Sequence, residues 1–202
     1  MIKNKIKIIL ASSSLRRKEL LKAIGLKYSS VKSTIEDQEK PLLNYKNLPP
    51  YKVAITLAHM KANDVSKKIK DKAVIIAADT IVVIKNRIIG KPSSKEDAAK
   101  MLKLLSGKTH RVITGLCVLK VPEYRESTFY VETTVTMAKM TARDIEWYVK
   151  TGEPLDKAGA YGIQGLGGLF IKKISGSYTN VVGLPVPELI ATLRKLGVIE
   201  LV

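Results

Sequence analysis

The stretch KIKIILASSSLRRKELLKAI (Lys5–Ile24) decides the fold class, because its pattern changes from strand to helix within a few residues. The apolar run in Lys5–Ala11 predicts a strand that ends at three serines. The segment Leu15–Ile24 then has apolar residues at helical spacing, and Gly25 is a typical helix stop. A chain that mixes strand and helix patterns in this way is typical of an α/β protein.

The rest of the chain continues to mix the two patterns. Helices are predicted at Tyr51–Ser66, Ser94–Leu105, Ala142–Thr151 and Pro187–Gly197. Strands are predicted at Tyr28–Val31, Ala73–Ala78, Ile81–Ile84, Arg87–Ile89, Val112–Val121, Glu126–Met140 and Leu169–Ile174. Ile35–Pro50 and the glycine-rich residues 158–168 are predicted loops. No repeat or long linker divides the chain, so we expect one domain over residues 1–202, with a mixed sheet flanked by helices.

Composition excludes several classes of protein. The chain has 202 residues, of which 46% are hydrophobic and 26% charged, so it is not mainly disordered. Its single cysteine excludes an internal disulfide and a thiolate zinc site, and its two histidines exclude a histidine-rich metal cage. No segment has the pattern of a signal peptide or of a membrane-spanning helix. We therefore expect a soluble, cytoplasmic protein with no membrane contact.

The net charge of +17, from 35 basic and 18 acidic residues, invites a nucleic-acid interpretation. Two phenylalanines and one tryptophan leave little for base stacking, and no nucleic-acid-binding motif is present. The basic residues are mostly lysines spread through predicted helices. Local basic clusters suit a smaller polyanion, such as a nucleotide, better than a nucleic acid.

The first candidate site lies where the first strand leads into the first helix. Free N–H groups at a helix start bind anions, and the hydroxyls of Ser12 and Ser14 could join them. Arg16 and Arg17 oppose the helix dipole there, a local cost that a bound phosphate would offset. The alternative is a serine N-cap followed by solvated arginines.

The second candidate is Asp79-Thr80, directly after the predicted strand Ala73–Ala78. Ligands of α/β sheets gather beyond the carboxyl ends of strands, where a carboxylate can hold a divalent metal or act as a general base. The alternative is a turn residue at the strand end. Lys61 and Lys91 could each grip a phosphate, although either could also be an ordinary solvated lysine.

Two further stretches could contribute to a site. Six glycines lie between residues 152 and 168, where they permit close approach of a ligand, and Gln164 could read the edge of a base. The acidic residues Glu36 and Asp37 could ligate a metal that bridges phosphates, or could belong to a solvated loop. His59 and His110 are expected to be packing or surface residues, and Cys117 a core residue.

Several short motifs occur in one order from about residue 6 to residue 196. They are LASSSLRR (10–17), ADT (78–80), GKP (90–92), LSG (105–107) with His110 and TG (114–115), DKAGAYGIQG (156–165) and NVVGLP (180–185). This set resembles the Maf family of nucleoside triphosphate pyrophosphatases. The resemblance implies hydrolysis to the monophosphate and pyrophosphate, with dTTP and UTP preferred. It also implies a divalent cation, Mg²⁺ or Mn²⁺, a possible homodimer, and an elongated Maf/ITPase-like fold with two lobes around a nucleotide cleft.

The resemblance also assigns roles to residues. Asp79 matches the general base, and Glu36 or Asp37 is expected near the metal with it. Three residues match positions that the family associates with substrate choice: Arg16, Thr80 and Gln164. Three match phosphate-contacting residues: Arg17, Lys61 and Lys91.

One position departs from the family pattern. Leu15 stands where the family usually has proline, so the helix start lacks the preset φ of proline, and we expect a small effect on affinity. Two other functions stay open at this point. One is a nucleotide-sensing cell-division regulator with weak hydrolysis, and the other is a basic nucleic-acid-binding protein.

Overall fold

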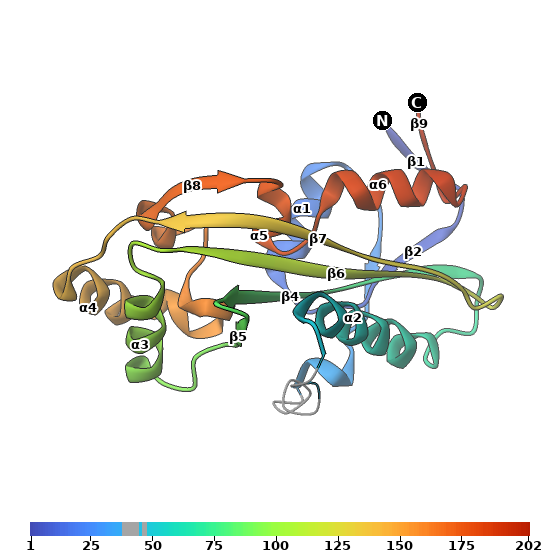
Figure 1. The fold of residues 1–202 in the computed structure, drawn as a ribbon. Coiled ribbons are helices and arrows are strands. Elements are labelled where there is room, and N and C mark those ends of the chain that lie inside the picture. The colour runs from blue at the N-terminus through green and yellow to red at the C-terminus, as the bar shows by residue number, and fades with distance from the viewer. Residues whose placement is uncertain (38–44, 46–47) are drawn as a thin grey trace. The chain divides into compact units, whose positions relative to one another are not determined.

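The structure is a computed structural model that describes residues 1–37, 45 and 48–202, with the backbone alone at residues 36 and 37. The chain forms two compact units. Figure 1 labels the helices and strands. Unit 1 comprises Met1–Asp79, Thr114–Val131 and Gly183–Val202, and unit 2 comprises Thr80–Ile113 and Glu132–Val182. The predictions of a single domain and of a cleft between two lobes stay predictions.

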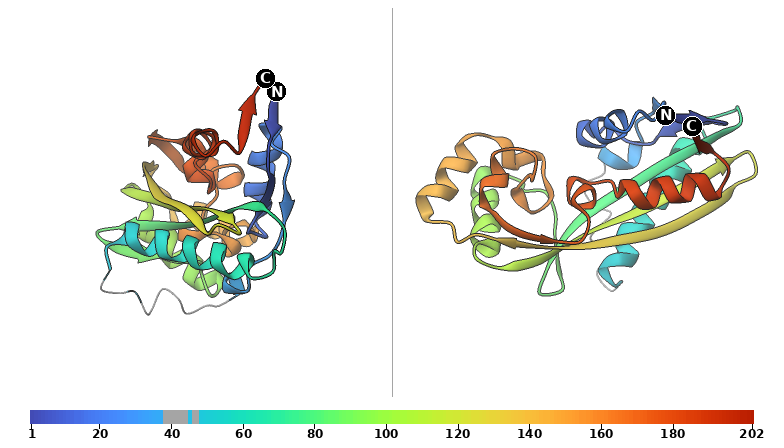
Figure 2. Two further views of the ribbon diagram at one scale, coloured as in Figure 1. Left: turned by 90° about the vertical axis from the view of Figure 1, so that its right-hand side faces the viewer. Right: turned by 90° about the horizontal axis from the view of Figure 1, so that it is seen from above.

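The strands form a mixed sheet, as predicted. Their order is β3-β2-β4-β6-β7-β8, and β5 pairs with β4. Their bounds are β2 (Lys7–Leu10), β3 (Ser29–Ser30), β4 (Ala73–Ile84), β5 (Arg87–Ile89), β6 (Thr109–Val121), β7 (Arg125–Met137) and β8 (Ile171–Ser175). β2 is parallel to β3 and β4, whereas β5 and β8 are antiparallel to their partners. A second, small sheet pairs β1 (Ile2–Asn4) with β9 (Ile199–Leu201), so the two termini lie side by side (Figure 2).

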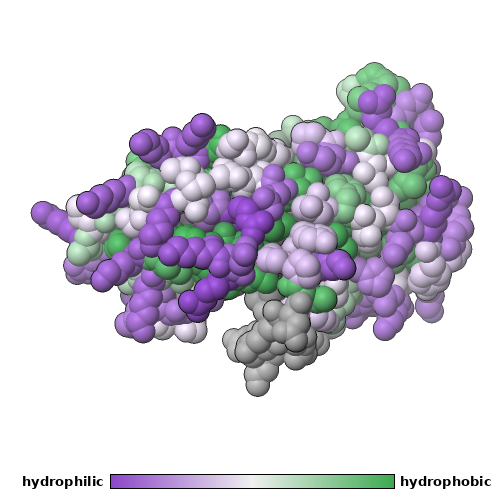
Figure 3. Space-filling model, viewed as in Figure 1, coloured by the Kyte–Doolittle hydropathy of each residue, from purple (hydrophilic) through white to green (hydrophobic). Residues whose placement is uncertain are grey.

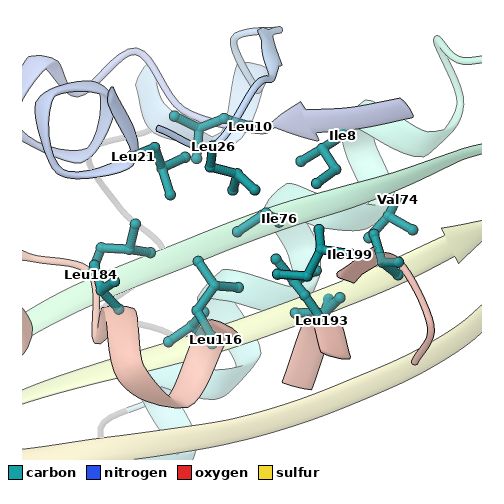
Figure 4. Close-up of a cluster of buried hydrophobic side chains, with 14 of the residues drawn as sticks. Ile8, Leu10, Leu21, Leu26, Val74, Ile76, Leu116, Leu184, Leu193 and Ile199 are labelled. Carbon is teal, nitrogen blue, oxygen red and sulfur yellow. The ribbon is translucent and has the colours of Figure 1, made fainter. Parts of the chain in front are cut away.

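Unit 1 buries both faces of its part of the sheet. It contains α1 (Leu15–Ala23), α2 (Pro50–Ser66), α6 (Val186–Lys195) and the 3-10 helix η1 (Thr34–Asp37). Side chains of α1 and α6 pack on one face, in the cluster of Figure 4 that includes Ile8, Leu10, Leu21, Val74, Ile76, Leu116 and Leu193. Side chains of α2 pack with the other face, in the cluster that includes Ile9, Ala58, Ala62, Val65, Ala73, Ile75, Ala77 and Cys117. β4 contributes to both clusters, because successive strand residues point to opposite faces of the sheet. A strand buried on both faces has apolar residues in succession, as in this part of β4.

Unit 2 has its own core around the ends of the long strands. Its helices are α3 (Lys95–Leu105), α4 (Ala142–Lys150), α5 (Tyr178–Val182) and the 3-10 helices η3 (Glu153–Asp156), η4 (Ala158–Ala160) and η5 (Leu166–Phe170). The core includes Val82, Ala98, Leu102, Leu105, Val112, Met137, Tyr148, Val149 and Tyr161. Both α3 and α4 begin at side-chain caps, because the hydroxyls of Ser94 and Thr141 accept hydrogen bonds from N–H groups three residues on.

The structure corrects several predicted elements. The predicted break at Asp79-Thr80 is wrong, because β4 runs through both residues. β7 ends at Met137, three residues early, and the predicted loop 158–168 contains 3-10 turns. The short elements β1, α5 and β9 were not predicted; they are three to five residues long, too short to show a hydrophobic period.

A helix that spans a membrane must be both long and apolar. Within the described residues, no helix is long and apolar enough to cross a membrane. Hydrophilic residues cover much of the face shown in Figure 3.

Candidate active site

Asp79 and Lys61 form an ion pair inside unit 1, between Lys61 Nζ and Asp79 Oδ1. Ala73, Ile75 and Ala77 pack with α2, so strand alternation directs Asp79 toward the same helix. Lys61 lies on the face of α2 that packs there. The side chains are 10% and 17% exposed for Lys61 and Asp79 respectively, so each charge has lost most of its water and depends on the other.

This pair explains why β4 does not end at Asp79. A carboxylate without a partner inside a strand would lose its hydration with no compensation. Lys61 supplies that compensation from another element. The lysine predicted to contact phosphate therefore lies against the predicted base, and its contact with phosphate stays a prediction.

The start of α1 holds a second group of predicted residues, also in unit 1. Arg17 is buried; its Nε donates to the Gly183 carbonyl at 2.9 Å and its Nη1 donates to Ser12 Oγ at 3.2 Å. Ser12 Oγ also accepts from the Ser14 N–H at 3.2 Å. The guanidinium thus ties the strand end to the segment before α6, and the alternative of a solvated Arg17 is wrong.

The other predicted residues of this segment are more accessible. Ser14 is the N-cap of α1 and makes no side-chain capping bond, and the first turn carries no acidic residue. Arg16 is half-buried. The side chains of this turn therefore bring no negative charge to the positive end of the helix dipole.

The segment that leads to Glu36 and Asp37 is tied to α2 by Asp64. The Asp64 carboxylate accepts from the Thr34 N–H at 2.9 Å, from Ser33 Oγ at 3.0 Å and from Thr34 Oγ1 at 3.0 Å. The side chains of Glu36 and Asp37 lie outside the described residues, so their role at a metal stays a prediction. Sequence reasoning did not single out Asp64.

Unit 2 holds Thr80, Lys91 and Gln164. Thr80 is half-buried in β4, and Lys91 and Gln164 are exposed. The Gly159 N–H donates to the Gly90 carbonyl at 2.9 Å, which joins the loop of Lys91 to the glycine-rich segment of Gln164. Gly159 has φ +72°, and a Cβ there would press on Val82, so both backbone conformation and space require glycine.

Glu153 organises the glycine-rich segment and was not predicted as a site residue. Its carboxylate accepts from Tyr148 Oη at 2.8 Å, the Leu166 N–H at 2.9 Å and the Gly167 N–H at 3.1 Å. Burial raises the pKa of this carboxyl, but these hydrogen bonds and the Lys157 charge outweigh it and lower the pKa. Its position in the glycine-rich stretch of residues 152–168 was the sequence signal that could have identified it.

The two histidines and the cysteine have the packing and surface roles that we expected. His110 is buried, and its Nε2 lies 2.7 Å from Tyr161 Oη; burial lowers the pKa of its imidazole to about 4. His59 is half-buried, and its Nε2 lies 3.1 Å from Glu126 Oε2. Cys117 is fully buried, and burial raises the pKa of its thiol to about 12, as expected for a core cysteine.

Comparison with known proteins gives one family. Residues 7–196 match the family described as "Maf-like protein". A protein named dTTP/UTP pyrophosphatase from Bacillus pumilus is 48% identical over 191 residues, which cover 95% of this chain and 97% of the relative. A protein of the same name from Alkaliphilus metalliredigens is 48% identical over 189 residues, with 94% and 95% covered. The chain belongs to the Maf family.

Solved structures give a weaker likeness. The Ham1 protein of Staphylococcus aureus has a TM-score of 0.48 and 16% identity, over 94% of this chain and 99% of that chain.

Proposed function

We propose that the protein hydrolyses dTTP and UTP to the monophosphate and pyrophosphate. The observation that carries the proposal is the Asp79–Lys61 pair, which holds a carboxylate at a defined place in a chain of the Maf family. The names of the relatives from Bacillus pumilus and Alkaliphilus metalliredigens support the reaction and the preference for thymine and uracil nucleotides.

In the proposed reaction, water attacks the α-phosphorus of the nucleotide. The bond between the α-phosphorus and the bridging oxygen breaks, and pyrophosphate leaves. Asp79 accepts the proton of the attacking water as the general base. Lys61 holds the Asp79 carboxylate through Oδ1, which leaves Oδ2 outside that pair. Arg17, Lys61 and Lys91, with the start of α1, would hold the phosphates, because guanidinium, ammonium and N–H groups suit phosphate oxygens.

The Asp79 carboxylate is a ligand of the chemical kind that a divalent cation, Mg²⁺ or Mn²⁺, would use. Hard cations of this kind are commonly held by one or two carboxylates together with substrate phosphates, so a dedicated cage of protein ligands is not needed. Among the described side chains, no group of three or more His, Cys, Asp or Glu residues could hold a metal. Asp79, with Glu36 or Asp37, would hold the ion, whose chemistry is to neutralise charge on the leaving pyrophosphate.

Substrate choice would rest on Arg16, Thr80 and Gln164. An amide side chain can both donate to and accept from the edge of a pyrimidine, which suits Gln164 for reading uracil or thymine. Measurement of pyrophosphate release with magnesium across dTTP, UTP, CTP, 7-methyl-GTP and ITP tests this. Release from dTTP and UTP is expected. Salt-sensitive nucleic-acid binding or tight nucleotide binding, with no turnover of any triphosphate, would contradict the proposal.

The role of Asp79 as the general base has its own test. Asp79→Asn should lower kcat by roughly a hundredfold to ten-thousandfold, while nucleotide binding measured by calorimetry largely survives. Asp71→Asn, an exposed change just before β4, is the matched control. Near-normal turnover of the Asp79 variant would remove Asp79 from the base role.

A further inference from the structure

The loop that carries Gln164 is held by one partly buried network in unit 2. Glu153 lies three residues beyond the end of α4, at the first position of η3. Its Oε1 accepts from Tyr148 Oη and the Gly167 N–H, and its Oε2 accepts from the Leu166 N–H. Three donors therefore converge on one carboxylate, and two of them belong to the backbone just after Gln164.

Tyr148 extends the network to the other side of Gln164. Its side chain is fully buried, and its Oη accepts from the Gly162 N–H at 3.2 Å. The hydroxyl thus joins Gly162 to Glu153, and Glu153 joins Leu166 and Gly167. Both ends of the turn that presents Gln164 are held, while the Gln164 side chain itself is exposed.

The glycines of this loop make room for the network. A Cβ on Gly165 would lie 2.5 Å from Glu153 Oε2, and a Cβ on Gly162 would lie 2.6 Å from Lys157 Cε. A Cβ on Gly167 would overlap Tyr148 Oη. We expected the glycines to admit a ligand, but at these three positions they admit side chains of the chain itself. The loop is built around Glu153.

We propose that Glu153 is a positioning residue for base recognition: its carboxylate fixes residues 162–167 in the conformation that presents Gln164 to the nucleotide base. This inference rests on the proposed function, because it assumes that Gln164 reads the base. It predicts that Glu153 affects the discrimination between nucleotides and not only the amount of folded protein. A residue that only stabilises the fold would change turnover of all nucleotides alike.

The test compares Glu153→Gln with wild type and with Glu146→Gln. Glu146 is on α4 and forms an exposed ion pair with Lys150 at 2.7 Å, so it matches the charge change but lies outside the network. Glu153→Gln replaces an acceptor by an amide NH₂ that opposes a backbone N–H. We expect kcat/KM for UTP to fall roughly tenfold to a hundredfold, with less loss for CTP, and amide hydrogen exchange of residues 162–167 to accelerate. Adding Glu153→Gln to Gln164→Ala should cost little more, since both changes act through one contact.

The outcomes separate this inference from the proposed function. Wild-type protein that releases no pyrophosphate from dTTP or UTP contradicts the proposed function, and with it base reading by Gln164. Active wild type with unchanged discrimination and unchanged exchange in a folded Glu153 variant overturns the positioning role alone. If Glu153→Gln does not fold, Tyr148→Phe takes its place, because it removes the hydrogen bonds that join Tyr148 to Glu153 and to Gly162 in the same network. Full additivity with Gln164→Ala would also overturn the inference.

Discussion

Asp64 gives a prediction whose size follows from its contacts. Its carboxylate accepts from Ser33 Oγ, the Thr34 N–H and Thr34 Oγ1, and lies 3.1 Å from Lys68 Nζ. Burial raises the pKa of this carboxyl, but the bonds from Thr34, Lys68 and Ser33 outweigh it and lower the pKa from 3.8 to about 2. The ionised form therefore stabilises the folded protein.

The magnitude follows from linkage between protonation and folding. Each unit of pKa difference corresponds to about 1.4 kcal/mol, so the shift at Asp64 amounts to about 2 kcal/mol after allowance for its partial exposure. The folded-state pKa is depressed, so this contribution is fully present above the unfolded pKa and is lost as the pH falls through the folded pKa. Roughly half of it is lost at pH 3.

Urea unfolding of wild type and Asp64→Asn at pH 7, 4 and 3 measures this. The variant should be less stable by about 2 kcal/mol at pH 7, and the difference should narrow toward pH 3. Glu19→Gln, an exposed change on α1, is the control and should show no such narrowing. A difference that stays constant from pH 7 to pH 3 would refute the reasoning.

Three further changes have defined expectations. Lys61→Met should lower kcat at least about tenfold with a smaller change in KM, because Asp79 loses the partner that holds it. Steady-state kinetics with UTP measure both constants. A rise in KM alone would instead favour a contact between Lys61 and phosphate. Gly115→Ala should destabilise the protein by about 3 kcal/mol in urea unfolding, because the added Cβ overlaps the Ala54 backbone of α2. Thr141→Ala should cost about 1 kcal/mol in the same assay through loss of the α4 cap, and an unchanged midpoint would argue against that cap.

Local patterns were sufficient for much of the fold. The helices α2 and α3 have apolar residues at helical spacing, and their starts carry Pro50 and the Ser94 cap. Such signals involve residues a few positions apart, which contact each other once the local conformation forms. The order of the motifs also indicated the family, which the comparison confirmed.

The continuation of β4 through Asp79 could not be predicted from local pattern. A charged residue after an apolar run indicates a turn, because a buried carboxylate without a partner is costly. Lys61 is 18 residues away and reaches Asp79 only after α2 packs on the sheet. The spacing of Ala58, Lys61 and Val65 is compatible with one face of a helix, but it does not say that Asp79 lies opposite the lysine.

The same holds for the loop of Gln164. The glycines between residues 152 and 168 marked it as unusual, yet their number alone does not say what comes close to them. Glu153 reaches the N–H groups of Leu166 and Gly167 because the chain turns back between residues 153 and 166, and local sequence pattern does not show that return. Local conformation is encoded by neighbours in the chain. A charge that loses its water needs a partner to compensate for the cost of desolvation, and tertiary packing decides whether a residue far away in the sequence supplies that partner.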